Sequence, residues 1–472
     1  MELKFGTSGV RGPVTELCGP PAFTYTLAFV RMLIERGAVA EGDAVYLGQD
    51  LRPSSPEIAR ICSAAIEAAG LSPRDCGALP TPALAAHAMA KKRPAIMVTG
   101  SHIPDDRNGL KFYRADGEID KADEAEISRL QAELAAEGGH SLAPRRPVAA
   151  DDDAVAAYRA AYTGFFARDA LAGLTVGVYQ HSSVARDLLV ELLEALGAQA
   201  VVLGRSDSFV PVDTEALRPE DVALARGWAA SGSFDAIVST DGDADRPLIA
   251  DETGAFLRGD LVGTMAARYL GAKTVVTPVT SNSALEESGR FGAVVRTRVG
   301  SPYVIAGMAE AGDTEVAGFE ANGGFLLGWT VKRDGRTLPA LRTRDAVLPI
   351  LATLASLSEA GRPLSELAAG YAFKAVASDR LKNVAQADSA ALLARLTEDA
   401  AYAEALFGEL GGVTAVNPSD GLRFTLGNGE TVHFRASGNA PELRCYVEAD
   451  DADRAAARLA WGLAALSARL GG

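Results

Sequence analysis

The sequence predicts an α/β protein that is divided into several domains. Short apolar runs typical of strands alternate with helical stretches through most of the chain, and this alternation is the pattern of layered α/β domains. The chain has 472 residues, more than one hydrophobic core usually fills, so we expect several cores. Hydrophobic residues make up 48% of the sequence, which is enough to build those cores.

Capping residues and helix breakers mark the predicted helices. Ser54 and Glu57 form a capping-box pattern, Pro56 suits the first turn, and the apolar pattern stops at Gly70. A proline follows Thr81, which predicts another helix start because proline is preorganised for the first turn. Two later stretches are also predicted to be helical. The predicted helices therefore lie at Ser54 to Gly70, from Thr81 onward, at Leu364 to Leu367, and at Asp451 to Leu470.

The predicted strands are short apolar runs, many of them bounded by glycine. Their residues are mostly β-branched or aliphatic, which is typical of buried strands in α/β sheets. The clearest of these runs are Ala44 to Leu47, Thr175 to Tyr179, Val201 to Leu203, Ala236 to Val238, and Thr274 to Thr277.

Shifts in composition predict three domain boundaries. Residues 137–147 are rich in helix breakers and precede the acidic run 151–153, which we interpret as a solvated helix start. A second boundary is expected near residues 251–254 and a third near Gly370. The predicted domains are residues 1–148, 149–252, 253–370 and 371–472.

Charge and cysteine use narrow the class of protein. The formal net charge of −15 argues against nucleic acid as a partner, because phosphate backbones select basic surfaces. Four cysteines without C-x-x-C spacing predict reduced thiols rather than disulfides or a zinc site. Residues 1–6 do not form a charged-then-apolar leader, and no apolar run is long enough to span a bilayer. We therefore expect a cytoplasmic protein without a membrane partner.

Three alternating carboxylates give the strongest physical signal in the chain. Asp241, Asp243 and Asp245 directly follow a strand-like run, and their oxygens can converge on one hard cation. Mg²⁺ suits such a set, since it takes few protein carboxylates and completes its shell with water or phosphate oxygens. Two other interpretations stay open: a solvated acidic turn, and a phosphatase that uses the first aspartate as nucleophile.

A calcium loop is a further interpretation of this segment. Glu252 stands at the twelfth position counted from Asp241, as an EF-hand requires. The sixth position needs glycine for a sharp turn but holds Arg246, which is followed by Pro247. The flanking segments are also predicted as strands rather than helices, so the EF-hand interpretation is disfavoured.

Ser101 is a candidate nucleophile. It lies in the segment 97–104, at the end of a strand-like run and in a glycine-containing turn that we expect to be exposed. Open α/β sheets assemble active sites at the carboxyl ends of their strands. The surrounding sequence lacks the G-x-S-x-G elbow of serine hydrolases, so its chemistry must be of another kind.

Two glycine-containing loops complete the set of candidate segments. Residues 435–444 place Ser437, Gly438 and Asn439 after Arg435, a combination that can bind an anion through backbone N–H groups and a guanidinium. Residues 318–324 place Glu320 and Asn322 in a glycine-rich loop suited to sugar hydroxyls. Each loop alone is also consistent with an ordinary turn.

Taken in order, these four segments resemble the α-D-phosphohexomutase family, most closely its bacterial phosphomannomutase branch. The resemblance spans nearly the whole chain, since it also includes residues 5–12 and 48–55. It implies a four-domain architecture around a central cleft: three similar α/β domains followed by a C-terminal α+β domain.

The resemblance also implies residue roles. Ser101 would be carried as phosphoserine, and its phosphate would hold Mg²⁺ together with Asp241, Asp243 and Asp245. Lys111 and Arg11 would lie near the reacting oxygens, with Lys111 as acid or base and His102 beside the nucleophile. The remaining roles are sugar binding by Glu320 and Asn322, and binding of the distal phosphate by Arg435, Ser437, Gly438 and Asn439.

The implied reaction moves a phosphoryl group between the 1- and 6-positions of a hexose phosphate, with mannose as the expected sugar. Hexose 1,6-bisphosphate would be the intermediate and the activator. Phosphoglucomutase and phosphoglucosamine mutase are the alternatives within enzymes, and a non-catalytic sugar-phosphate-binding or calcium-binding protein is the alternative outside them. The chain departs from common family patterns at Ile103, where many relatives have asparagine, and at Asn322 and Gly324, where many have serine and histidine.

Overall fold

The computed structural model describes residues 3–6, 9–312, 314–437 and 441–470. The chain forms two compact units. The first comprises Met1–Val275 and Gly300–Ala368, and the second comprises Val276–Val299 and Ala369–Gly472. Among the described residues, no helix combines the length and the apolar character needed to cross a membrane.

The amino-terminal region is built on one mixed sheet, with strand order β1-β2-β6-β5-β3-β4-β8 and β7 paired to β6. Strand β3 is parallel to both β4 and β5, while β6 is antiparallel to β5 and β2. The strands are Lys4–Gly6 (β1), Gly9–Pro13 (β2), Ala44–Gln49 (β3), Ser72–Ala78 (β4), Ala95–Val98 (β5), Arg107–Arg114 (β6), Gly117–Glu118 (β7) and Ala149–Ala150 (β8).

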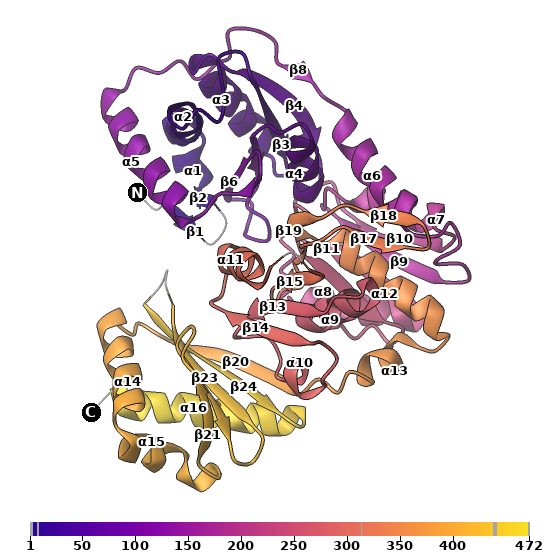
Figure 1. The fold of residues 1–472 in the computed structure, drawn as a ribbon, viewed down its shortest axis with the longest axis vertical. Helices are drawn as coiled ribbons and strands as arrows, with labels where there is room; N and C mark the ends of the chain where they lie inside the picture. Colours follow the sequence, from indigo (N-terminus) through magenta and orange to yellow (C-terminus); the bar gives the residue numbers. More distant parts are fainter. Residues whose placement is uncertain (1–2, 7–8, 313, 438–440, 471–472) are drawn as a thin grey trace. The chain divides into compact units, whose positions relative to one another are not determined.

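Helices flank this first sheet and bury its apolar side chains. Helices α2, α3 and α5 contribute to one continuous core with strands β3, β5 and β6, and Figure 1 shows α2 and α5 side by side. Helix α4 packs against β3 and β5. The helices are Val14–Leu17 (α1), Pro20–Glu35 (α2), Ser55–Ala68 (α3), Thr81–Ala90 (α4) and Lys121–Glu137 (α5).

The second region has a four-stranded sheet in the order β10-β9-β11-β12. Strand β9 is parallel to β10 and β11, and β11 turns back into antiparallel β12. Every residue of β11 and β12 is buried, so the turn between them is held rigidly at the sheet end. The elements are α6 (Asp153–Phe165), β9 (Thr175–His181), α7 (Arg186–Ala195), β10 (Gln199–Arg205), α8 (Pro219–Ser231), β11 (Ala236–Thr240) and β12 (Pro247–Asp251).

The third region has a five-stranded sheet in the order β14-β13-β15-β16-β19 and a small β17-β18 hairpin. Its strands are Thr274–Pro278 (β13), Ala293–Thr297 (β14), Val316–Phe319 (β15), Phe325–Leu327 (β16), Val331–Arg333 (β17), Arg336–Leu338 (β18) and Leu341–Asp345 (β19). Its helices are Gly259–Leu270 (α9), Ala284–Glu287 (α10), Ser301–Ala311 (α11), Val347–Ala360 (α12) and Leu364–Ala369 (α13).

The carboxyl-terminal region is an antiparallel sheet in the order β20-β24-β23-β22-β21. The terminal helix α16 packs against β20 and β24 and lies along this sheet in Figure 1. The elements are β20 (Ala375–Lys382), α14 (Gln386–Glu398), α15 (Ala400–Phe407), a 3₁₀ turn (Gly408–Leu410), β21 (Val413–Asn417), β22 (Leu422–Leu426), β23 (Thr431–Ala436), β24 (Glu442–Ala449) and α16 (Ala452–Leu470).

The structure confirms the predicted strands and helices but corrects one helix cap. All five predicted strands lie within β3, β9, β10, β11 and β13, and the predicted helices are α3, α4, α13 and α16. Ser54 precedes α3 without capping it through its side chain. Its hydroxyl instead accepts a hydrogen bond from Asn108 Nδ2 at 2.9 Å, and Glu57 pairs with Arg60. The capping-box prediction was therefore wrong, because a tertiary contact uses the serine.

Candidate active site

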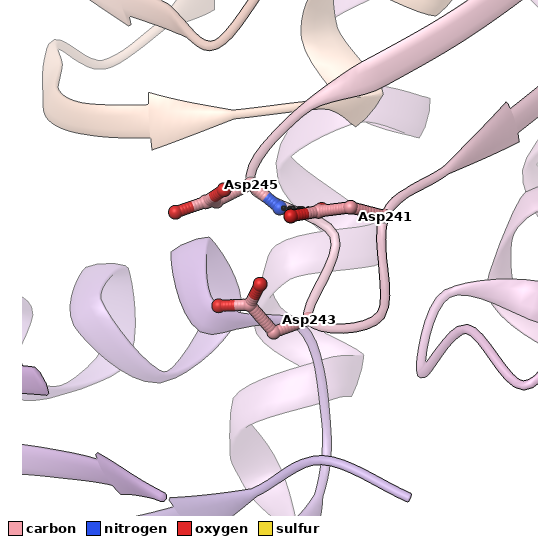
Figure 2. Close-up of side chains that lie close together, drawn as sticks. All are labelled: Asp241, Asp243 and Asp245. Atoms are coloured by element: carbon pink, nitrogen blue, oxygen red, sulfur yellow. Dashed lines mark hydrogen bonds between the residues drawn. The ribbon is translucent and has the colours of Figure 1, made fainter. Parts of the chain in front are cut away.

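The three aspartates lie on one tight turn between β11 and β12. Their side chains converge in Figure 2, and one oxygen from each lies within 4.8 Å of the others. Asp241 Oδ1 accepts hydrogen bonds from the backbone N–H groups of Asp245 and Arg246, each at 3.2 Å. All three carboxylates are at most 1% exposed, so the interpretation as a solvated turn was wrong.

Two buried carboxylate oxygens of this turn fit a cation. Asp243 Oδ1 and Asp245 Oδ1 have no hydrogen-bond partner among the described residues. A buried charged oxygen without a donor is costly unless it is paired or binds a metal. The donor set is all oxygen, as Mg²⁺ prefers, so these residues fit a divalent metal site.

Positive side chains pair with the second carboxylate oxygen, Oδ2, of Asp243 and of Asp245. Lys111 Nζ lies 2.6 Å from Asp243 Oδ2 and 2.5 Å from Asp245 Oδ2. Arg344 Nη2 donates to Asp245 Oδ2 over 2.7 Å. Because these donors occupy the Oδ2 atoms, they fix the rotation of the carboxylates and leave the Oδ1 atoms for another ligand.

Burial and charge act in opposite directions on two of the aspartates. Burial raises the pKa of Asp241 well above its usual range, and the neighbouring Asp243 and Asp245 add to this rise. Burial alone would also raise the pKa of Asp245, but Arg344, Lys111 and Arg246 hold it below its usual range. Asp245 is therefore an anion at neutral pH, ready to bind a cation.

Ser101 lies beside this turn, at the end of β5. Its hydroxyl donates to Asp241 Oδ2 over 2.5 Å, and its φ of +57° is a left-handed conformation that a serine rarely adopts. Such backbone strain often accompanies function. Ser101 is 0% exposed, so the prediction of an exposed serine was wrong: the aspartate turn of the second region covers it.

A buried arginine holds the serine loop in this conformation. Arg52 is 1% exposed, its Nε donates to Asp50 Oδ2 over 3.0 Å, and its guanidinium stacks 4.0 Å from the Phe209 ring centre. Its remaining N–H groups donate to the carbonyl oxygens of Ser101 (2.9 Å), Ile103 (2.6 Å), Pro104 (2.7 Å) and Arg107 (3.2 Å). A Cβ at residue 100 would lie 2.7 Å from Arg52 Cζ, which explains the glycine before the serine.

His102 is oriented by an arginine and is neutral. Arg246 Nη1 lies 2.9 Å from His102 Nδ1, which lies 3.3 Å from Ser101 Oγ. Burial lowers the pKa of His102 to about 2, and the charges of Arg246 and Arg11 contribute. Because His102 is uncharged at neutral pH, it accepts a hydrogen bond from Arg246 rather than supplying a proton.

Arg11 adds a further positive charge on the neighbouring strand. It lies on β2 opposite Gly109 of β6, two residues before Lys111. Burial, together with Arg246 and Arg344, lowers the pKa of Arg11 to about 10, so the guanidinium stays charged at neutral pH. Three guanidinium atoms, Arg11 Nη2, Arg246 Nε and Arg344 Nε, are buried without a hydrogen-bond partner in the described part of the chain.

The predicted sugar loop joins β15 to β16 and reaches the same site. Glu320 is 5% exposed, and its Oε2 accepts a hydrogen bond from Arg344 Nη1 at 3.0 Å. Since Arg344 also contacts Asp245, the sugar loop and the aspartate turn share one guanidinium. Asn322 Oδ1 accepts a hydrogen bond from the Gly324 N–H group at 3.0 Å, which stabilises the loop.

The predicted phosphate loop belongs to the other compact unit. Arg435, in β23, donates from Nε to Asp420 Oδ2 over 2.7 Å, and its side chain is 15% exposed. Ser437 donates its backbone N–H to the carbonyl oxygen of Glu442 over 2.9 Å. The predicted contributors Gly438 and Asn439 lie outside the described residues.

The EF-hand interpretation of the aspartate turn was wrong. Glu252 accepts hydrogen bonds from the Ser365 N–H group at 3.1 Å and from the Ser365 hydroxyl. It therefore supports the start of α13 instead of completing a calcium loop. The segment after Asp241 forms strand β12 rather than a helix.

Comparisons with known proteins agree with this arrangement. Family models described as phosphoglucomutase/phosphomannomutase alpha/beta/alpha domains I, II and III, and as the C-terminal domain, match residues 2–137, 156–254, 258–372 and 381–463. The chain belongs to the phosphoglucomutase/phosphomannomutase family. It is thus an enzyme of the phosphohexomutase type, as the resemblance predicted.

Individual relatives match this chain over nearly its full length and support its place in the family. A Sinorhizobium fredii protein named phosphomannomutase is 50% identical over 474 residues, covering 100% of both chains. A Salmonella muenchen protein of the same name is 41% identical, covering 99% of this chain and 96% of the relative. The crystal structure of a phosphoglucomutase/phosphomannomutase family protein from Burkholderia thailandensis superposes on this chain with a TM-score of 0.78 at 21% identity. The match covers 99% of this chain and 98% of that chain. The four-domain fold prediction is confirmed.

Sequence reasoning missed three side chains of this candidate site: Arg52, Thr81 and Arg344. Thr81 was identified only as a helix start, yet its hydroxyl donates to Asp243 Oδ2 over 2.5 Å. Arg52 lies in the segment 48–55 that contributed to the resemblance, but no local pattern assigns its role. Arg344 lies one residue before the end of β19, where only one of the three preceding strand residues is buried, so no local pattern signals its role.

We predict that Arg52→Lys lowers turnover about ten- to a hundredfold, because a lysine cannot hold four carbonyl oxygens and a shift of about 1 Å in a reacting group has that effect. Amide hydrogen exchange of residues 99–107 should rise in the variant. Arg60→Lys, at an exposed ion pair with Glu57 in the same domain, is the control. Unchanged turnover and unchanged exchange in Arg52→Lys would contradict the clamp.

Proposed function

We propose that the enzyme is a phosphomannomutase that interconverts mannose 6-phosphate and mannose 1-phosphate through phosphorylated Ser101 and a hexose 1,6-bisphosphate. The observation that carries this proposal is the hydrogen bond of 2.5 Å between Ser101 Oγ and Asp241, within a turn that has two carboxylate oxygens without a hydrogen-bond partner among the described residues. The two relatives described above carry the name phosphomannomutase. Support for mannose comes from these names and from the overall resemblance of the loops.

Mg²⁺ would be held by Asp241, Asp243, Asp245 and the phosphate on Ser101. When bound, it supplies positive charge to the phosphoryl oxygens. Lys111 Nζ and Arg344 Nη2 orient Asp245 through its Oδ2 atom, at distances of 2.5 and 2.7 Å. Calcium would serve poorly because its bonds are longer and its geometry is looser.

The residues around Ser101 position it and manage charge. Asp241 accepts the Ser101 hydroxyl hydrogen, and Arg52 fixes the loop backbone behind it. Arg11 and Arg246 place positive charge where phosphoryl oxygens gather, which stabilises the transferred group. We assign Lys111 as the acid or base for the sugar hydroxyl, supported by its buried position within hydrogen-bond reach of two aspartates.

Two loops would bind the sugar and the phosphate that is not reacting. Glu320 would accept hydrogen bonds from sugar hydroxyls and Asn322 would assist, since both lie in the β15–β16 loop. Arg435 and Ser437, with Gly438 and Asn439 from the resemblance, would bind the phosphate that is not reacting.

In the reaction, phospho-Ser101 transfers its phosphoryl group to the vacant sugar hydroxyl, whose proton is relayed through the Lys111 ammonium to Ser101 Oγ, so that Lys111 keeps its charge and Ser101 regains its hydroxyl. The bond between phosphorus and Ser101 Oγ breaks as the new phosphate ester forms. The bisphosphate then turns around and returns its other phosphoryl group to Ser101, which releases the isomer. Added hexose 1,6-bisphosphate is the proposed activator because it restores phospho-Ser101.

Phosphoglucomutase or phosphoglucosamine mutase activity is the alternative, because Asn322 and Gly324 depart from the common sugar loop. A coupled assay that compares mannose, glucose and glucosamine 1-phosphates discriminates among the three. Membership in an enzyme family argues against a non-catalytic sugar-phosphate binder, which would also leave the strained Ser101 unexplained. Preferred turnover of glucose or glucosamine 1-phosphate would replace the mannose assignment.

The proposed setting is the cytoplasm, with a hexose phosphate as the small-molecule partner. The four cysteines are free thiols, which suits a reducing compartment, and the net charge of −15 supports the absence of a nucleic-acid partner. We also propose domain boundaries near residues 148, 252 and 370. The four family matches, with gaps at 138–155, 255–257 and 373–380, support these boundaries.

We predict that Ser101→Ala abolishes turnover but leaves the fold intact, because the change removes one hydroxyl and its hydrogen bond to Asp241. Mass spectrometry of wild-type enzyme treated with hexose 1,6-bisphosphate should place a phosphate on the peptide that contains Ser101. Ser128→Ala, on the distant helix α5, is the matched control and should stay active. Absence of the phosphopeptide would reject the covalent mechanism.

Asp243→Asn should raise the Mg²⁺ concentration for half-maximal activity at least about tenfold, because one charge leaves the proposed metal shell. Asp221→Asn changes a carboxylate that is equally buried but pairs with Arg218 and Tyr179 instead of belonging to the aspartate turn, and its Mg²⁺ dependence should match wild type. Metal dependence is measured by titrating Mg²⁺ after chelation. Strong support of turnover by Ca²⁺, or an unaltered Mg²⁺ curve for Asp243→Asn, would contradict the assignment.

Arg435→Ala should raise KM about ten- to a hundredfold, since a charge-assisted contact contributes roughly 1.5 to 3 kcal/mol. Arg435→Lys should recover only part of this loss, because lysine supplies charge without the planar fork. The alanine variant should also release bisphosphate early and depend more on added bisphosphate. If its KM and bisphosphate requirement equal those of wild type, the Arg435 loop is only a turn.

A further inference from the structure

One guanidinium joins two loops that the proposed reaction uses for different tasks. Arg344, near the end of β19, is 1% exposed. Its Nη2 lies 2.7 Å from Asp245 Oδ2 and its Nη1 lies 3.0 Å from Glu320 Oε2. The aspartate turn and the sugar loop are thus connected through a single planar group, which cannot move toward one carboxylate without leaving the other.

The sugar loop makes room for this arginine. A Cβ at Gly324 would lie 2.7 Å from Arg344 Cδ, 3.0 Å from its Cγ and 3.1 Å from the Asp245 carbonyl oxygen. The stem of Arg344 therefore fills the space that any side chain at residue 324 would need. Arg344 can occupy its position only because residue 324 is a glycine and has no side chain.

The strand that carries Arg344 is anchored on both sides of it. Thr343 donates its hydroxyl to Glu118 Oε1 over 2.7 Å. Asp345 accepts the hydroxyl of Tyr158 at 2.6 Å, the hydroxyl of Tyr162, and the N–H group of Val347 at 2.7 Å. With both neighbours fixed, the position of the Arg344 backbone is set and its guanidinium has little freedom.

Asp245 is oriented by this contact. Its Oδ2 accepts from both Arg344 and Lys111, while its Oδ1 has no hydrogen-bond partner among the described residues. Outer contacts of this kind set the direction and affinity of a metal ligand. The same guanidinium orients Glu320. The position of Arg344 therefore affects both the proposed cation ligand and the proposed sugar ligand.

We propose that Arg344 is a positioning residue that couples the sugar loop to the metal-binding turn. This inference rests on the proposed function, in which Asp245 holds the cation and Glu320 binds sugar hydroxyls. The two carboxylates share one positive charge, so a change of charge at Glu320 alters how strongly Arg344 interacts with Asp245. Sugar binding and cation binding are therefore linked energetically, and the link disappears when Arg344 is replaced.

The test is a double-mutant cycle on Mn²⁺ affinity, measured by electron paramagnetic resonance without any turnover. Glu320→Gln removes a charge from the sugar loop and strengthens the hold of Arg344 on Asp245. We expect it to weaken Mn²⁺ binding at least about threefold in a chain that keeps Arg344, because the guanidinium then neutralises more of the negative charge on Asp245. In an Arg344→Met chain, the same Glu320→Gln change should have no effect.

Glu430→Gln is the matched control. Glu430 is 2% exposed and pairs with Arg454 and Arg458 in the carboxyl-terminal region, so its neutralisation should leave Mn²⁺ affinity unchanged. If Arg344→Met fails to fold, Arg344→Lys replaces it, because one ammonium cannot bridge both carboxylates and the link should again be lost.

An equal effect of Glu320→Gln with and without Arg344, or no effect in either chain, would overturn the coupling. Because the measurement uses Mn²⁺ binding alone, it is separate from the mutase assay. Wild-type enzyme that turns over mannose phosphate but shows no coupling rejects only this inference. Wild-type enzyme without mutase turnover rejects the proposed function, whatever the Mn²⁺ cycle shows.

Discussion

Three buried carboxylates on one six-residue turn impose the main constraint on this site. Asp241, Asp243 and Asp245 repel one another in a low-dielectric environment, so the fold must bring positive charge to them. Lys111 comes from the first region and Arg344 from the third, and both contact the turn within 2.7 Å. Within the turn itself, Arg246 adds a longer contact, 3.7 Å from Asp245 Oδ1. The packing of three regions of the first compact unit against each other therefore depends on this electrostatic balance.

The proposed nucleophile, Ser101, depends on the same balance of charge at the aspartate turn. Ser101 is held by Asp241 on one side and, through its carbonyl oxygen, by Arg52 on the other. A serine with φ of +57° persists only when its surroundings determine its conformation. Here a fully satisfied buried arginine does so, because its donors reach four carbonyl oxygens of one loop. Positioning and charge are the main contributions that a protein makes to phosphoryl transfer, and the contacts of Arg52, Lys111 and Arg344 can supply both.

Local patterns predicted the elements and the loops but not the contacts between them. The strand before the aspartate turn and the helix at Thr81 were predictable because their signals lie within a few residues. Arg344 was missed because its partner Asp245 lies 99 residues away in the sequence. Ser101 was expected to be exposed because the turn that buries it lies 140 residues further along the chain. At Ser54, a contact with Asn108 took precedence over the local capping pattern.

The central claim is that the Oδ1 atoms of Asp243 and Asp245 bind a divalent cation while Lys111 and Arg344 hold the Oδ2 atoms. Anomalous diffraction from a crystal containing Mn²⁺ tests it most directly. The account predicts one strong anomalous peak about 2 Å from both Oδ1 atoms, with Lys111 and Arg344 still bonded to Oδ2. A peak that displaces Lys111, or no peak at this turn in fully metal-loaded crystals, would contradict it.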